Sequence, residues 1–469
     1  MTAAHTRRAP RMAVPVLPTS RARSWLGIWG TIFACTWGGN QFSPLLLMYE
    51  DRAHYSSLVV NAFLGVYVLG LAPALLVSGS LSDRHGRRPV LLAGVAAAVT
   101  GSTLLAFGPA GAIFLAAGRL FSGVTVGVAM AVGSSWLKEL SQPPFDPAAE
   151  EASGARRSSL AFTLGSGIGA LVAGLIAQWG PIPEVLPFLI HIGVTLPFAF
   201  VVLATPETHK TGGVAGRWWR QLRIPSAGHR RFVRVVAIAA PWLFASAGIG
   251  YGYLPTQLRD ATGSWGLVFA TAATVVALGA SSAIQPVAKR LHSLESARGL
   301  ATGVFIIAAG IAVGAVAISA QSVWAGLAAN VVIGAGLGIA LVSGLLEVQR
   351  IATPADLAGL TGVFYALAYA GFLAPTVIAA IAASIPATTI LWAVTALAVA
   401  SWVLILTAST RHLPASDDAP PPHLKCPCGV YAEPGGRGDR GSAVRGLLPG
   451  TRDDAGGSYP DPGIRGDER

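Results

Sequence analysis

Twelve long apolar stretches divide this sequence, and they constrain its fold more than any other feature. The first six cover residues 25–48, 58–80, 90–107, 112–137, 159–179 and 185–204, and the second six cover 235–253, 267–284, 301–320, 324–346, 358–383 and 388–407. A helix needs roughly 20 apolar residues to cross the hydrocarbon of a bilayer. Only 12% of the residues are charged, whereas a soluble chain carries about 25%. The pattern predicts an all-α membrane protein with twelve transmembrane helices.

The positions of Lys and Arg predict which side of the membrane each loop faces. Of the 33 Lys and Arg, 30 lie in the two tails and in alternate loops, and Arg52 and Arg259 are the ones in the remaining loops. Loops rich in Lys and Arg stay in the cytoplasm, so both termini should be cytoplasmic, which requires an even number of spans. The net charge of +11 therefore indicates orientation and not a nucleic-acid partner. We expect a multi-pass protein of a bacterial inner (cytoplasmic) membrane, in direct contact with the lipid bilayer.

These features predict five regions. They are a cytoplasmic N-terminal tail (1–23), an N-terminal six-helix bundle (24–204), a cytoplasmic central loop (205–234), a C-terminal six-helix bundle (235–410) and a disordered cytoplasmic C-terminal tail (411–469). The last has almost no apolar run and so cannot bury a core. Cys426 and Cys428 lie in that tail near His423, but three potential ligands in a flexible segment are weak grounds for a metal site. We expect neither a metal nor a cofactor.

The sequence repeats itself at an offset of 211 residues. The offset superimposes Arg119, Gly123, Gly127 and Gly133 on Asn330, Gly334, Gly338 and Gly344. Both sets lie in the fourth stretch of their half, where glycines four residues apart line one helix face and let another backbone approach closely. Two related halves are typical of a transporter built from repeats, with its site between them near the middle of the membrane.

The loop after the second stretch carries regularly spaced glycines and charges. Its glycines permit close helix contact and a tight turn, and an aspartate lies among three arginines. At every defined position the loop resembles the signature loop of the major facilitator superfamily; the positions here are Gly79, Leu81, Ser82, Asp83, Arg84, Gly86, Arg87 and Arg88. The resemblance extends over residues 24–410. The alternative reading is simple anchoring of the loop in the cytoplasm.

In that superfamily the loop braces the cytoplasmic side, partly against the start of the eleventh helix. Here Thr353, Pro354 and Asp356 resemble that start, with Thr353 as the cap, Pro354 at the first helical position and Asp356 in the first turn. The resemblance therefore implies that Asp83 lies near the N-terminus of the eleventh helix. Cysteines at Ser82 and Leu357 test this, because they leave Asp83 in place.

Arg119 is the one basic residue deep within a predicted span, and an intramembrane charge indicates a function by default. Its spacing to Gly123 and Gly127 resembles the superfamily's fourth-helix motif, which implies a role in proton coupling. The alternative is a structural bond to backbone carbonyls. No Asp or Glu lies deep in any span. The groups that remain as proton carriers are Glu347, which we favour, and Glu139, Asp83 and His191.

The fifth stretch is rich in small residues, with Gly165, Gly169 and Gly174 on it. It resembles the antiporter motif of exporters, although Ala170 stands where the family has proline. Ordinary packing of small residues between helices is the alternative.

Polar and aromatic residues inside helices are the candidates for contact with a substrate, because lipid-facing positions do not tolerate polar groups. The adjacent amides Asn40 and Gln41 lead this set because two amides in mid-helix demand partners. The other members are Asn330, Tyr365 and Tyr369. For a Tyr near a helix end, anchoring at the membrane interface is the alternative.

Together these features predict a secondary transporter that acts by alternating access, as a monomer, and exports a small molecule in exchange for protons. The alternatives are an uptake symporter, an uncoupled facilitator of a small metabolite, and a non-transporting membrane sensor with the same fold. No nucleotide-binding motif is present, and no constellation of catalytic residues lies at an interface. We therefore do not expect an enzyme.

Overall fold

The computed structural model describes residues 23–150, 153–208, 224–291, 293, 295–353 and 356–411, and all regular structure among them is helical. The described residues belong to one unit of the chain, residues 1–414. Most of both predicted tails, with Cys426 and Cys428, and most of the predicted central loop lie outside the described residues.

The N-terminal half contains α1 (Ser24–Asn40), α2 (Leu45–Arg52), α3 (Ser57–His85), α4 (Arg87–Ala106), the 3-10 turn η1 (Gly108–Ala110), α5 (Ala112–Val128), the π-helical turn η2 (Ala129–Gly133), α6 (Ser134–Leu140), α7 (Ser153–Trp179) and α8 (Leu186–Ala204). Because η2 joins α5 to α6 without a break, these three elements form one long helix, Ala112–Leu140.

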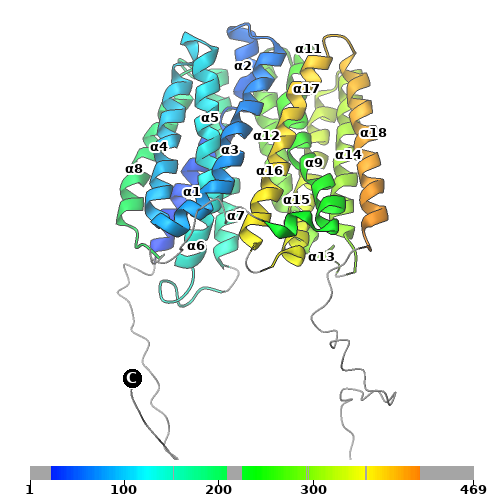
Figure 1. The fold of residues 1–469 in the computed structure, drawn as a ribbon. Coiled ribbons are helices and arrows are strands. Elements are labelled where there is room, and N and C mark those ends of the chain that lie inside the picture. The colour runs from blue at the N-terminus through cyan, green and yellow to red at the C-terminus, as the bar shows by residue number, and fades with distance from the viewer. Residues whose placement is uncertain are drawn as a thin grey trace, which may run out of the picture. The chain divides into compact units, whose positions relative to one another are not determined.

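The C-terminal half contains η4 (Pro225–Gly228), η5 (Phe232–Val236), α9 (Ala237–Ala247), η6 (Gly248–Tyr253), α10 (Leu254–Gln257), α11 (Arg259–Thr262), η7 (Gly263–Trp265), α12 (Gly266–Ala283), α13 (Gln285–Arg290), α14 (Arg298–Ala320), α15 (Val323–Ile351), α16 (Leu357–Ala370), η8 (Gly371–Leu373), α17 (Ala374–Ile381) and α18 (Ala387–Ala408). Of the short turns, η5 and η6 are π-helical and the others are 3-10. The helices run side by side (Figure 1).

Eleven helices among the described residues are long and apolar enough to cross a membrane, and they correspond to the second to twelfth predicted stretches. The first predicted stretch is divided into α1 and α2 by a tight turn at residues 41–44. In this turn Ser43 donates its backbone N–H to Asn40, three residues earlier, and Pro44 has no N–H to donate. The helical ladder is therefore interrupted, and each piece is shorter than the roughly 20 residues that span the hydrocarbon.

Helix packing in the two halves follows one scheme. In the N-terminal half α3 packs on α5, α4 on α5, α4 on α8 and α1 on α7; in the C-terminal half α12 packs on α15, α14 on α15, α14 on α18 and α9 on α16. A Cβ atom on Gly123 would overlap the carbonyl oxygen of Tyr67 in α3, and one on Gly334 would overlap that of Ala277 in α12. Gly127 and Gly338 approach the same two helices one turn further on. The glycines thus lie where backbones meet at equivalent places in both halves.

The bundle has two distinct ends. Figure 1 draws α2 and α11 near one end and α6 and α13 near the other. The end with α6 and α13 carries the loop between α3 and α4 and most of the described Lys and Arg, so we call it the basic end. The end with α2 and α11 is called the opposite end.

Two seams join the halves. In the first, α3 packs on α16 and α17. Thr376 donates to the carbonyl oxygen of Asn61 at 2.8 Å on the side of the opposite end, and Leu76 meets Gly362 towards the basic end. This seam is therefore packed along its length.

The second seam joins α7 to α12. Gln178 donates to the carbonyl oxygen of Ser264 at 3.0 Å near the opposite end. Ser282 donates to Thr163 at 3.2 Å nearer the basic end. Both seams are therefore packed towards both ends of the bundle.

Candidate functional site

Arg119 projects from α5 into the interior, and 2% of its surface is exposed. Its Nη1 donates to the carbonyl oxygen of Gly39 at 3.0 Å, and its Nε donates to that of Phe63 at 3.4 Å. The guanidinium carbon lies 4.4 Å from the ring centre of Tyr67 and 4.9 Å from that of Phe42. Among the described residues no carboxylate is paired with it. Backbone carbonyls and aromatic faces hold this buried cation.

Asn330 occupies the matching place in the C-terminal half. Its Nδ2 donates to the carbonyl oxygen of Gly250 at 3.1 Å and to that of Gly326 at 3.0 Å. Asn330 follows Arg119 by 211 residues, and Gly250 follows Gly39 by the same 211. Gly39 lies in the last turn of α1, just before the turn at residues 41–44, and Gly250 lies in the π-helical turn η6. Each half therefore uses a donor on its fourth span to satisfy a carbonyl of its first, irregular segment.

Aromatic rings from both halves meet beside Arg119. Tyr67 of α3 lies edge-on to Tyr369 of α16 and to Phe372 of η8, each at 6.3 Å between ring centres. Phe244 of α9 stacks on Tyr369 at 4.0 Å and on Phe372 at 5.2 Å. The Tyr369 hydroxyl donates to the sulfur of Met130 at 3.5 Å. We call Tyr67, Phe244, Tyr369 and Phe372 the aromatic cluster; it joins the halves at the centre.

Gln41 is fully buried in the turn between α1 and α2 and takes part in a polar chain. Its Nε2 donates to Ser102 at 3.3 Å, and the Ser102 hydroxyl lies 2.6 Å from Nδ1 of His191. Nε2 of His191 lies 2.9 Å from the carbonyl oxygen of Ala34 and 3.1 Å from Thr195. A neutral His191 that donates from Nε2 and accepts at Nδ1 satisfies all these partners.

The predicted substrate residues therefore occupy different places. Tyr369 belongs to the aromatic cluster, and Tyr365 lies one helical turn before it, half-buried. Gln41 contacts the interior of the N-terminal half, and Asn330 contacts that of the C-terminal half. Asn40 is the last residue of α1 and is half-buried.

Glu347 lies at the basic end, in a buried ion pair. Nε and Nη2 of Arg231 donate to its two oxygens at 2.7 and 3.1 Å, and Arg350 adds a third bond at 3.2 Å. The side chains of Arg231 and Glu347 are 0% and 3% exposed. Nη1 of Arg231 also donates to the carbonyl oxygens of Ser409 and Arg411. These bonds tie α15 to the start of η5 and the end of α18, and none of them involves Arg119.

The signature loop forms its own charge cluster at the basic end. Arg87 donates to Asp83 at 2.7 Å and to Glu139 at 2.9 Å. The carboxylate of Glu207 accepts the backbone N–H groups of Arg87 and Arg88 at 3.0 and 2.9 Å. The loop therefore binds the ends of α3, α6 and α8 to the start of α4, all within the N-terminal half.

The glycines of the loop differ in their surroundings. Gly86 has φ of 93°, a conformation that favours glycine, at the turn from α3 to α4. Gly79 has open space around it, so close contact does not require a glycine there. Arg84 lies in the last turn of α3.

The eleventh predicted helix begins three residues after Pro354. α16 starts at Leu357, so Asp356 lies at the N-cap and Pro354, which is outside the described residues, precedes the helix. The Asp356 carboxylate accepts from the backbone N–H of Ser226 at 3.0 Å and from Thr353 at 2.8 Å. Burial raises the pKa of Asp356, but these hydrogen bonds outweigh it and bring the pKa to about 2.

The glycines of α7 lie at contacts with two helices. A Cβ on Gly165 or Gly169 would run into the α1 backbone, and one on Gly174 would overlap Thr271 of α12. Gly165 and Gly169 therefore serve packing within the N-terminal half, whereas Gly174 lies on the seam between the halves.

At the opposite end an ion cluster joins the halves. Arg259 of α11 pairs with Glu50 at 3.1 Å and with Asp51 at 2.8 Å, both on α2. Ser57 also donates to Glu50 at 2.6 Å. Of the ion pairs among the described residues, these two alone cross from one half to the other. We call Glu50, Asp51 and Arg259 the outer ion cluster.

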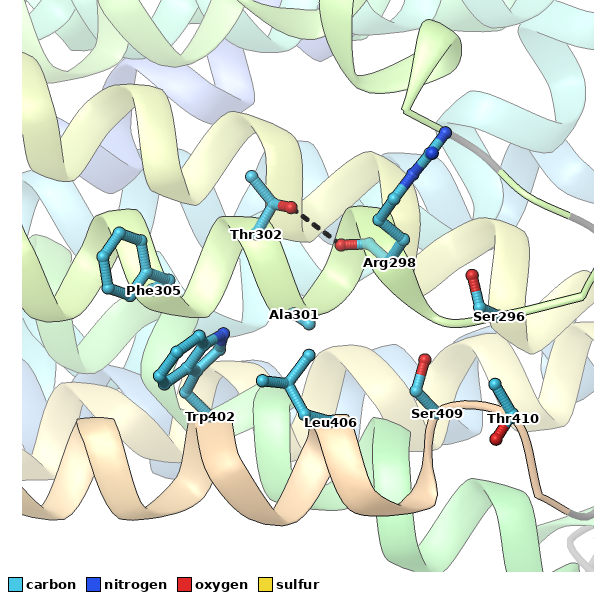
Figure 2. A pocket seen from close by; sticks show the side chains of 9 residues that line it. All are labelled: Ser296, Arg298, Ala301, Thr302, Phe305, Trp402, Leu406, Ser409 and Thr410. Carbon is cyan, nitrogen blue, oxygen red and sulfur yellow. Dashed lines mark hydrogen bonds between the residues drawn. The ribbon is translucent and has the colours of Figure 1, made fainter.

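Two surface hollows lie away from this centre. One, of about 460 Å³, is between α14 and α18 (Figure 2), and the other, of about 410 Å³, is between α1 and α7. Neither is lined by a residue of the aromatic cluster. The described residues hold no group of three metal-ligating side chains.

Sequence reasoning missed several central residues. Phe244 and Phe372 are ordinary apolar residues in a chain that is 53% hydrophobic, and only the rotation of their helices sets them apart. In the sequence Arg231 and Glu50 lie in a loop and at a helix end, yet both are buried in ion pairs. A signal was present in the sequence, because each is a charged residue within a few residues of a predicted span.

The family model of the Major Facilitator Superfamily matches residues 28–373, which is most of the chain. This chain belongs to the major facilitator superfamily. As a superfamily member it is a multi-pass membrane transporter and not an enzyme.

Its relatives in the superfamily include drug exporters. Multidrug efflux pump LfrA of Mycolicibacterium smegmatis is 34% identical over 140 residues, 28% of this chain and 25% of that protein. Multidrug transporter AQR1 of Candida glabrata is 28% identical over 188 residues, 39% of this chain and 29% of that protein. Multidrug resistance protein MdtL of Escherichia coli is 35% identical over 74 residues, 16% of this chain and 19% of that protein. The alignments thus span less than a third of each relative.

Solved structures of other transporters have the same fold. A POT family transporter in complex with 5-aminolevulinic acid aligns with a TM-score of 0.70 and 13% identity, over 83% of this chain and 96% of that chain. The D-xylose-proton symporter aligns with a TM-score of 0.64 and 15% identity, over 84% and 97%. At such identities the likeness concerns the fold alone.

Proposed function

We propose that this chain is a proton-coupled exporter that moves a small amphipathic molecule across the inner membrane by alternating access. The observation that carries the proposal is the aromatic cluster, which joins the halves between two seams that are packed at both ends. A site enclosed between two repeated halves suits alternating access, because rocking one half against the other exposes it to one side at a time.

The proposal treats α1 and α2 together as one membrane span, the first in the chain, which brings the total from eleven to twelve. The 17 residues of α1 extend about 25 Å at 1.5 Å per residue, and α2 continues beyond the turn. With twelve spans the basic end and both termini face the cytoplasm, in accord with the bias of Lys and Arg. The proposal keeps the five predicted regions, and residues 24–204 and 235–410 form the two bundles that rock against each other in a monomer.

The centre favours a flat, largely apolar substrate. Four aromatic rings and the thioether of Met130 offer stacking faces and an adaptable surface. Oε1 of Gln41 and Oδ1 of Asn330 are buried without a hydrogen-bond partner among the described residues. Both side chains contact the interior of their own half in this structure, so we propose that each accepts a donor group on the substrate only after the halves move apart. The names of the relatives, which are multidrug efflux and resistance proteins, support export.

An uncoupled facilitator is the second candidate. It is favoured by the ion pairs of Glu347 and Glu139, which commit both carboxylates to arginines at the basic end. An imposed pH gradient separates the two candidates. We expect purified protein in liposomes to move dyes of different charge (ethidium, Nile red and fluorescein) faster under an inward proton gradient. Equal transport rates with and without the gradient would instead identify the protein as an uncoupled facilitator.

Arg119 carries a charge and a structural bond, and a single variant separates them. Arg119→Asn copies the residue that holds the equivalent carbonyl in the other half, so it should fold. We expect it to lose gradient-driven transport and to keep exchange without a gradient. Arg119→Ala removes the donor as well and should reduce the folded yield. Full gradient-driven transport by the folded Arg119→Asn protein would contradict a coupling role for the charge.

Disulfides across the first seam test alternating access. In a background without Cys35, Cys426 and Cys428, we would introduce Gly65→Cys with Leu373→Cys, or Leu76→Cys with Gly362→Cys. Both pairs approach closely: a Cβ on Gly65 would lie 2.8 Å from Leu373, and one on Gly362 would lie 3.2 Å from Leu76. Either disulfide should stop transport, and reduction should restore it. Transport that continues with either disulfide closed would refute the mechanism.

A further inference from the structure

The hollow between α14 and α18, which we call the α14–α18 groove, has a polar end and an apolar end. Figure 2 shows Ser296, Arg298 and Thr410 towards one end and Phe305 and Trp402 towards the other. Phe305 comes from α14 and Trp402 from α18, and their rings lie 5.0 Å apart. Leu406 lines the middle of the groove.

The polar end holds a cation without an ion pair among the described residues. Arg298 is exposed, and its guanidinium forms no ion pair or hydrogen bond with the described residues. Ser296 and Thr410, which each carry a hydroxyl, line the same end of the groove. Arg298 is also the first residue of a membrane-spanning helix, and Thr410 follows the end of α18. These groups therefore lie at the level of lipid headgroups.

The apolar end lies deeper in the membrane. Phe305 is seven residues into α14, which is about 10 Å along the helix at 1.5 Å per residue. Trp402 lies six residues before the end of α18, at a similar depth. Phe305 is 48% exposed and Leu406 is 43% exposed, and in a membrane protein such surfaces face acyl chains. Any occupant of this groove therefore reaches it from the bilayer.

We propose that the α14–α18 groove binds an anionic phospholipid. The phosphate lies against Arg298 with Ser296 and Thr410, and an acyl chain follows Leu406, Trp402 and Phe305. A zwitterionic lipid fills the apolar end equally well but brings its own cation to Arg298, so the cation selects an anionic headgroup. The hollow of about 460 Å³ accepts a headgroup with the first part of one chain.

The hollow between α1 and α7 has related chemistry but a different polar end. Trp25, Leu26 and Leu160 line it, and Arg157 there is already paired with Asp146 and stacked on Trp25. Its remaining cation is the exposed Arg156. Lipid that binds in this second hollow would add to the measured signal, so each measurement is repeated in protein that carries Arg156→Gln.

The test measures thermal unfolding of the full chain in a neutral detergent after delipidation. Dioleoyl-phosphatidylglycerol, dioleoyl-phosphatidylcholine and inorganic phosphate are titrated separately, and lipid retention is followed by native mass spectrometry. We expect phosphatidylglycerol to raise the melting temperature at lower concentration than phosphatidylcholine, and phosphate alone to have no effect. Arg298→Gln should weaken the apparent affinity for phosphatidylglycerol about five-fold, the effect of one cation near the headgroups.

Matched variants make each outcome decisive. Arg290→Gln removes an exposed arginine at the same end that does not line the groove, and it should leave the affinity unchanged. Thr302→Trp fills the groove but keeps Arg298, and it should reduce retention of both lipids. Equal affinity for the two lipids, an equal loss in Arg290→Gln and Arg298→Gln, or stabilisation by phosphate alone would each overturn the assignment. None of these readouts depends on transport.

Discussion

The buried pair between Arg231 and Glu347 gives the sharpest prediction, because a coupling role and a structural role for Glu347 differ in outcome. Removing one partner of a buried ion pair costs about 3–5 kcal/mol, since the other charge stays buried. Glu347→Gln keeps one acceptor for Arg231, and Arg231 keeps its bonds to two carbonyl oxygens. We therefore expect the lower limit, about 3 kcal/mol, or roughly a 150-fold change in the folding equilibrium.

The assay is thermal unfolding in detergent, followed by tryptophan fluorescence at one fixed scan rate, because such unfolding is often irreversible. For a chain of this length, about 3 kcal/mol corresponds to a fall in melting temperature of roughly 3–6 °C. The control is the double variant Arg231→Met with Glu347→Leu, which replaces the pair by apolar side chains. It should melt within about 2 °C of the wild type, because an apolar replacement of a buried pair is often neutral or stabilising.

Transport by the double variant decides the role of Glu347. If the pair only connects α15 to η5 and α18, the double variant keeps gradient-driven transport. A folded double variant that transports without responding to the gradient would instead identify Glu347 as the proton carrier. An unchanged melting temperature in Glu347→Gln would refute the reasoning from burial.

Four further predictions follow from individual contacts. Gly123→Leu should abolish the folded protein, because its side chain would overlap the α3 backbone. Gly167→Leu should be tolerated, because a side chain there meets open space. Size-exclusion chromatography measures the folded yield of both variants. The folded pKa of Asp356, about 2, is below the unfolded value of about 3.9, so its contribution to stability is present above about pH 4 and is lost as the pH falls towards 2. The melting temperatures of the wild type and of Asp356→Asn should therefore converge as the pH falls over that range. A difference that stays constant with pH would contradict the hydrogen bonds of Asp356. Arg259→Gln removes the ion pairs of the outer ion cluster, so it should lower the yield of the Gly65→Cys with Leu373→Cys disulfide and leave that of Leu76→Cys with Gly362→Cys unchanged. An equal effect on both disulfides would argue that the outer ion cluster does not hold the halves together at that end. The register of α3 against α16 brings residue 82 opposite about residue 356, so Ser82→Cys and Leu357→Cys should crosslink, and no crosslinking in any state would count against the register.

Hydropathy and spacing predict much of this fold from the sequence. Eleven of the twelve apolar stretches correspond to helices of spanning length, because their length alone exceeds what a soluble core helix needs. The offset of 211 residues relates Arg119 to Asn330, and in the structure the same offset relates the carbonyls that they bind. A regular repeat in sequence thus carries information about three-dimensional contacts.

The remaining features depend on helix rotation and on tertiary contacts, which hydropathy does not encode. The interruption of the first stretch arises at Pro44, which has no N–H to donate to the helical ladder. Phe244 and Phe372 resemble lipid-facing residues in sequence, yet Phe372 meets Tyr67 of the other half and Phe244 stacks on Phe372. Glu347 lies near a helix end, where solvation is the ordinary expectation, yet Arg231 buries it. Only the packing of distant segments reveals these partners.

The outer ion cluster gives the two ends of the transporter different sensitivities. At the opposite end charges join the halves in addition to two neutral hydrogen bonds, and Arg259 is 45% exposed, so dissolved ions reach and screen these charges. Towards the basic end the halves meet through hydroxyl, amide and apolar groups, whose contacts barely respond to salt. In the proposed orientation, where the opposite end faces out of the cell, external salinity therefore adjusts how readily this protein opens outwards, while the ease of opening inwards stays fixed by shape.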